Sequence, residues 1–110
     1  MDIQFSTKLA VNNYMINNFT NKGCSGYTYV RQMLEYALES YKKIGYISPW
    51  KLSQLLKILN PPITYGACQR AVNYFLKTAN YEGTFSVFII ESLEKIIETQ
   101  QNNLLEGDEF

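Results

Sequence analysis

The chain has 110 residues, 46% of them hydrophobic, and its formal net charge is zero. This length fits one compact domain with a single core, and a chain this apolar is not expected to be disordered over most of its length. It contains no histidine, which excludes histidine-based catalysis and histidine metal sites, and its two distant cysteines, Cys24 and Cys68, are expected to be free thiols.

Apolar residues recur at helical spacing almost throughout, and no stretch alternates as a strand does. The sequence therefore predicts an all-α single domain of about five to six helices. The first helix is expected from about Ser6 to Phe19, with Leu9, Met15, Ile16 and Phe19 facing inward. The second is expected from Tyr27 to Ile44, and Gly45 stops it. Its predicted core stripe comprises Tyr27, Val30, Met33, Leu34, Ala37, Leu38, Tyr41 and Ile44.

A third helix of about eleven residues is expected to begin at Ser48-Pro49, because a capping serine followed by proline is a start signal. It must end before Asn60-Pro61-Pro62, since a residue that precedes proline avoids the helical conformation. Thr64 can then cap a fourth helix from about Tyr65 to Ala79. Its inward residues are expected to be Cys68, Ala71, Val72, Phe75 and Ala79.

A fifth helix is expected from about Phe85 to Gln101. Its predicted inward residues are Phe85, Ile89, Ile90, Leu93, Ile96 and Ile97. Residues 1–101 would thus form one helical domain, followed by an acidic tail, residues 102–110, that is expected to be disordered. No internal repeat and no second domain is evident.

Charge is distributed unevenly along the chain. Residues 1–81 carry nine basic and three acidic side chains, whereas residues 82–110 carry one basic and seven acidic ones. A basic body is compatible with nucleic-acid binding, because phosphate contacts need cations. An excess of basic residues of this size is also ordinary in a small domain, so the charge distribution alone does not decide whether the chain binds nucleic acid.

Other candidate sites are weak. The loop NKGCSG, residues 21–26, lacks the spacing of either common glycine-rich phosphate-binding motif. The carboxylates of Glu91, Glu94 and Glu98 share one helix face, which is usually a solvated surface and alternatively a docking site for a basic partner. We therefore expect no enzyme, no catalytic residue, no metal, no cofactor and no small-molecule substrate. Without a signal peptide or a long apolar run, a cytoplasmic protein with no membrane partner is expected.

The third and fourth predicted helices, joined by a short connection, have the pattern of a helix-turn-helix. In such a motif the first turns of the second helix face the major groove. Arginine can read guanine there, and glutamine or asparagine can read adenine. The pattern fits equally well an ordinary corner between two helices with solvated polar residues.

Several segments in order resemble one known family. They are GYTYVRQML (26–34), KIGYIS (43–48), LLKILNPPITYGACQRAVNYFLKTANYEG (55–83) and GTFSVFIIESLEKI (83–96). This order is similar to that of the C-terminal DNA-binding effector domain of the sporulation master response regulator of endospore-forming bacteria. The resemblance covers roughly residues 9–98 and implies an all-α helix-turn-helix fold. The family's recognition helix is basic at the positions of Ala67, Arg70, Asn73 and Tyr74, of which only Arg70 is basic here.

The resemblance implies sequence-specific binding of double-stranded DNA and control of transcription, without the family's receiver domain. We expect Arg70 and Gln69 to contact bases, and Lys51 and Lys57 to contact phosphates. The remaining predicted DNA contacts are Thr64, Tyr65, Asn73 and Lys77. The alternative is a protein-interaction module that keeps the fold but has lost DNA binding, with a second copy or a related regulator as its partner.

Overall fold

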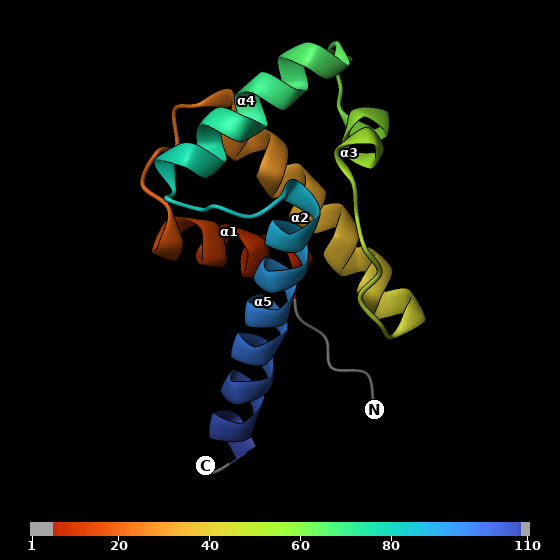
Figure 1. The fold of residues 1–110 in the computed structure, drawn as a ribbon. Coiled ribbons are helices and arrows are strands. Elements are labelled where there is room, and N and C mark those ends of the chain that lie inside the picture. Colours follow the sequence, from red (N-terminus) through yellow and green to blue (C-terminus); the bar gives the residue numbers. More distant parts are fainter. Residues whose placement is uncertain (1–5, 109–110) are drawn as a thin grey trace.

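The computed structural model describes the backbone of residues 6–108 and the side chains of residues 6–103. Five helices account for most of it (Figure 1): α1 Thr7–Asn18, α2 Ser25–Ile44, α3 Leu52–Ile58, α4 Tyr65–Thr78 and α5 Phe85–Asp108. The described part of the chain contains no strand, so the predicted all-α class is confirmed. The outer ends of the predicted domain and tail, residues 1–5 and 109–110, lie outside the described residues.

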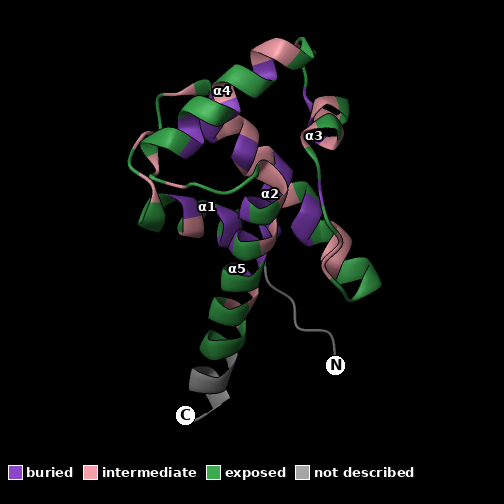
Figure 2. Ribbon diagram, viewed as in Figure 1, coloured by how far each residue is buried: buried purple, intermediate pink, exposed green. Residues whose placement is uncertain are grey.

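Helix α2 is the centre of the fold, because each of the other four helices packs against it. Its buried side chains form the predicted stripe along one face, which Figure 2 shows in purple. The prediction was wrong for Ile44, which is 48% exposed because it lies in the last turn, beyond the neighbouring helices. The predicted stop is confirmed: Gly45 has a φ of 84°, and its N–H donates to the carbonyl of Tyr41 at 2.8 Å.

Helices α2 and α4 cross in close contact at a glycine. A Cβ atom added to Gly26 would lie 2.2 Å from the carbonyl oxygen of Ala71 and 2.7 Å from the Cβ of Phe75. Only a residue without a side chain allows this approach. The ring of Phe75 then fills the core next to the crossing, with its centroid 5.2 Å from that of Phe19 and 6.0 Å from that of Tyr27. The position of α4 is therefore fixed by backbone contact as well as by buried side chains.

Helix α1 turns a different face inward from the one predicted. Ala10, Val11 and Met15 are buried, but Leu9 and Ile16 are 60% and 52% exposed. The apolar residues of α1 are distributed around the helix, so their spacing alone could not select the inward face. The N-terminal end of α1 is fixed to α2 by hydrogen bonds that join Thr7, Glu39 and Lys42.

Helix α3 begins later than predicted, at Leu52 rather than at Ser48-Pro49. The residues before it remain extended, and Trp50 is buried there with its ring centroid 5.4 Å from that of Tyr36 on α2. The backbone N–H of Lys51 donates to the side-chain oxygen of Gln54 at 2.7 Å and so caps the helix start. Burial of the indole outweighs the local start signal of serine and proline.

Helix α5 is longer than predicted, since it continues past Gln101 to Asp108. No glycine or proline interrupts residues 84–106, so nothing local stops the helix at the predicted end. Among its side chains up to Asn103, where the description of side chains ends, the last buried one is Ile96. Beyond this point the helix leads away from α4, and its last turns extend beyond the other helices (Figure 1).

Candidate nucleic-acid interface

Helix α4 has well-formed ends. The hydroxyl of Thr64 accepts a hydrogen bond from the N–H of Ala67 at 3.1 Å, which confirms the predicted cap. At the other end Asn80 has a φ of 57°, and the N–H of Tyr81 donates to the carbonyl of Leu76 at 2.9 Å. This is the hydrogen bond expected where a residue in the left-handed conformation closes a helix. The helix therefore covers the predicted segment to within one residue.

The two sides of α4 differ completely. Its inner side is apolar and buried, with Cys68, Val72, Phe75 and Leu76 in the core. Ala71 and Ala79, both predicted to face inward, are only half-buried. Its outer side, which we call the outward face of α4, is mostly polar. The outward face comprises Gly66, Gln69, Arg70, Asn73, Tyr74 and Lys77.

All residues predicted to contact DNA are exposed. Gln69, Arg70, Asn73 and Lys77 come together on the outward face, whereas Thr64 and Tyr65 lie at its N-terminal end. Lys51 and Lys57 lie on a separate element: Lys51 precedes α3, and Lys57 is in its last turn. Helix α3 packs against α4, so these two lysines lie on the segment next to α4 and not on the outward face itself.

Arg70 has a defined direction along the helix. Its Nη1 atom lies 3.4 Å from the place where a Cβ of Gly66 would be, so the guanidinium extends over the first turn of α4. Side chains on a helix lean toward its N-terminus, and Gly66 leaves this path open. The first turn is the part of a recognition helix that meets base edges. The only basic group in the middle of the helix is thus placed over that turn.

The connection between α3 and α4 differs from the short turn that was predicted. It spans residues 59–64, six in all, and α3 itself has seven residues rather than about eleven. Leu59 is buried within the connection, and the Asn60–Pro61 peptide bond is cis. A typical DNA-binding motif of this kind has a turn of three or four residues. This helix pair therefore departs from the predicted helix-turn-helix in the length of its first helix and of its turn.

Sequence reasoning missed Tyr74. Its side chain is 57% exposed, four residues after Arg70 on the outward face. On a helix of 3.6 residues per turn it lies about 40° around the axis from Arg70. The spacing i to i+4 was present in the sequence and could have identified it. The outward face therefore carries an aromatic side chain beside its arginine.

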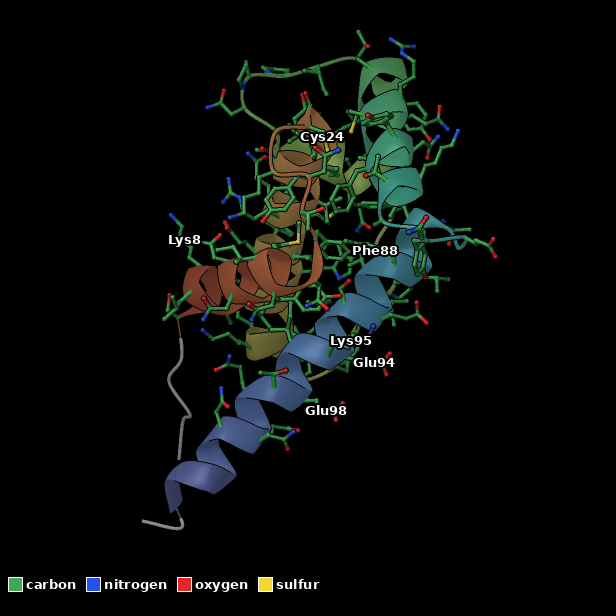
Figure 3. All side chains as sticks on the ribbon, turned by 90° about the vertical axis from the view of Figure 1, so that its left-hand side faces the viewer. Lys8, Cys24, Phe88, Glu94, Lys95 and Glu98 are labelled. Carbon is green, nitrogen blue, oxygen red and sulfur yellow. The ribbon has the colours of Figure 1, made fainter. Side chains whose placement is uncertain are left out.

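The chain around this face is free of acidic side chains. Residues 40–81, which include α3 and α4, contain six basic residues and no aspartate or glutamate. Acidic residues lie elsewhere in the chain: Glu91, Glu94 and Glu98 are exposed on α5. Figure 3 shows Glu94 and Glu98 along this helix. The hydroxyl of Tyr81 donates to Glu91 at 2.6 Å. Burial, together with this bond, raises the pKa of Tyr81 to about 12.

The cysteines offer no reactive pair. Both are free thiols, as predicted, and Cys68 is buried in the core, where desolvation raises the pKa of its thiol. Cys24 is half-buried at the residue that precedes α2. Among the side chains of residues 6–103, no group of three metal-binding residues is present.

Comparisons with known proteins give no relative: no family model, no curated protein and no solved structure matches the chain. Among the described helices, none combines the length and the hydropathy required to cross a bilayer.

Proposed function

We propose that the chain is a DNA-binding transcriptional regulator in which α4 is the recognition helix, as its resemblance to the sporulation regulator effector domain implies. One observation carries the proposal. The outward face of α4 is exposed and polar, has an arginine directed over its first turn, and lies in a segment without acidic residues. A helix with this surface meets the steric and electrostatic requirements of the major groove.

In this proposal the two ends of the surface have different roles. Arg70 contacts a base over the first turn of α4, while Lys77 at its C-terminal end contacts phosphate. Lys51 and Lys57 contact the phosphates of the strand beside α3. Base contacts such as that of Arg70 distinguish sequences, whereas phosphate contacts are the same for every duplex.

Fluorescence anisotropy with a mixed-sequence DNA duplex at several salt concentrations tests this function. Affinity should fall steeply with salt, because each phosphate contact releases counterions. Arg70→Ala should weaken binding by roughly 10-fold or more, the worth of a good base contact. Lys95→Ala is the matched control, since Lys95 is exposed on α5 and its loss should leave the affinity unchanged. Absence of binding at low salt would reject the proposal.

A protein-interaction role has one observation in its favour. Leu9 and Ile16 lie seven residues apart on α1, so they occupy one side of the helix, and both are more than half exposed. In this second candidate function, that side of α1 pairs with a second copy of the chain. Light scattering after size exclusion should then show a dimer that becomes a monomer when both residues are changed to glutamate. A monomer at high concentration that binds DNA would reject this role.

A further inference from the structure

The outward face of α4 has a particular mixture of base-reading groups. It carries two amides, Gln69 and Asn73, one guanidinium, Arg70, and one aromatic ring, Tyr74, all of them exposed. A bidentate amide is the usual partner of adenine, and a bidentate guanidinium that of guanine. This surface can therefore read adenine at more positions than guanine. The inference below rests on the proposed function, because it concerns which duplex the same surface recognises.

The two amides are available for base contacts. Among the residues that the structure describes, neither Gln69 nor Asn73 has a side-chain hydrogen-bond partner. Asn73 lies near the middle of the outward face, between the positions of Gly66 and Lys77. Gln69 lies at its edge, about 100° around the axis from Arg70. Asn73 is thus better placed to reach a base than Gln69, which reverses the order expected from the sequence.

Tyr74 adds an apolar contact that favours thymine. Its ring is 57% exposed, so it can reach a partner that lies against the outward face. In the major groove only thymine presents a methyl group, and apolar side chains recognise it by contact. Around the helix axis Asn73 and Tyr74 lie about 60° and about 40° to opposite sides of Arg70, so one side chain can contact an adenine while the other contacts a neighbouring thymine.

The distance between Arg70 and Asn73 along α4 determines how far apart the bases that they contact lie in the duplex. The Arg70 guanidinium lies over Gly66, seven residues before Asn73, which is about 10 Å along the helix axis at 1.5 Å per residue. Because the Asn73 side chain also leans toward the N-terminus, about 8–10 Å separate its amide from the guanidinium. Successive base pairs are about 3.4 Å apart. The guanine that Arg70 contacts would therefore lie two or three base pairs from the adenine that Asn73 contacts.

We propose that α4 recognises an A·T-rich duplex with one guanine at its edge: Arg70 reads the guanine, and Asn73 and Tyr74 read an adenine and a thymine two or three base pairs away. Tyr74 is then a specificity-determining residue. Lys77, as a point charge, contacts phosphate and adds no base preference.

Selection of duplexes from a random library with the full chain gives the first test. The enriched duplexes should share an A·T-rich run with one G·C pair two or three base pairs from its most restricted adenine. Asn73→Ala should relax the choice at that adenine, with a loss of about 5-fold or more in affinity for the selected duplex. Enrichment of G·C-rich duplexes would overturn the inference and leave DNA binding itself intact.

Replacement of the thymine by deoxyuridine tests Tyr74 directly, because it removes only the methyl group. The unchanged protein should bind the uracil duplex about 4-fold more weakly, the worth of one buried methyl-sized group. Tyr74→Ala should bind both duplexes equally, and its melting temperature should match that of the unchanged protein because Tyr74 is exposed. Equal binding of both duplexes by the unchanged protein would overturn the role of Tyr74. If no duplex binds at low salt, the proposed function fails instead.

Discussion

Helices α4 and α5 are held in different ways. The buried residues of α4 run from Cys68 to Leu76, so that it is attached over most of its length. Among the described side chains of α5, which end at Asn103, the last buried one is Ile96, and the helix continues to Asp108. Helix α4 is therefore positioned by tertiary packing, while the outer part of α5 depends on local helix stability.

The same two helices differ in charge. The segment with α4 has no acidic side chain, and α5 exposes several glutamates on a part of the molecule that leads away from it (Figures 1 and 3). The basic side chains of α4 thus lie on a different part of the molecule from Glu94 and Glu98 of α5. A fixed helix without acidic neighbours is suited to a surface that must approach phosphate, since mobility would weaken directional contacts and acids would repel the partner.

The largest effect is expected from removal of the ring that attaches α4 to the core. Phe75 is 1% exposed and packs against Phe19, Tyr27 and Phe88, so Phe75→Ala should destabilise the fold by about 3–5 kcal/mol. Chemical denaturation followed by circular dichroism measures the loss. The adjacent exposed residue provides the control, since Tyr74→Ala should change stability by less than about 0.5 kcal/mol. Similar losses for both variants would contradict the attachment of α4 described above.

A smaller loss of stability is expected when a side chain is added at the crossing of α2 and α4. Gly26→Ala places a Cβ atom 2.2 Å from the carbonyl oxygen of Ala71, so the two helices must separate, at a cost of about 1–3 kcal/mol. Thermal unfolding would show this as a lower melting temperature. Gly23→Ala should have little effect, because nothing lies within 4 Å of its added Cβ. An unchanged melting temperature for Gly26→Ala would show that the crossing can relax.

The cap of α4 should contribute less than its packing. Thr64→Ala removes the acceptor of the Ala67 N–H and should cost about 1 kcal/mol, whereas Thr64→Ser keeps a hydroxyl and should cost much less. Urea denaturation of the two variants measures the difference. A loss as large as that from Phe75→Ala would mean that local capping, rather than packing, holds this helix.

The smallest effect on stability is expected from the hydrogen bond that Tyr81, in the connection between α4 and α5, donates to Glu91 of α5. Burial and the Glu91 contact raise the pKa of Tyr81 to about 12 from an ordinary value of 10.0, which means that folding favours the protonated phenol. Its contribution to stability is therefore complete below pH 10 and is lost as the pH rises toward 12. The stability difference between the unchanged protein and Tyr81→Phe should narrow across this range. A constant difference would exclude titration of this phenol as its source.

The sequence predicted α4 well because its signals agree. Thr64 is a capping residue after two prolines, and the apolar residues that follow share one side of the helix. In α1 they do not, so the burial of Ala10 and Val11 rather than Leu9 and Ile16 could emerge only from the fold. The start of α3 was wrong for a related reason, since the burial of Trp50 against α2 is a long-range contact that no local pattern contains.

For the candidate site, the sequence predicted exposure better than arrangement. That Arg70, Asn73 and Lys77 share one exposed side followed from their spacing on the helix. The extension of Arg70 over Gly66 depends on a rotamer, and the close approach at Gly26 depends on a second helix, so neither could be predicted. Binding of DNA by these residues remains a prediction.

Trp50 is the chain's single tryptophan, and it lies buried against Tyr36 just before α3. Its fluorescence therefore reports on one place, the junction between the α3 segment and α2. Excitation at the red edge of the absorption band, where tyrosine does not absorb, would follow the opening of this junction separately from the loss of helix. The protein thus carries an intrinsic optical probe beside, but not within, the surface proposed to meet DNA.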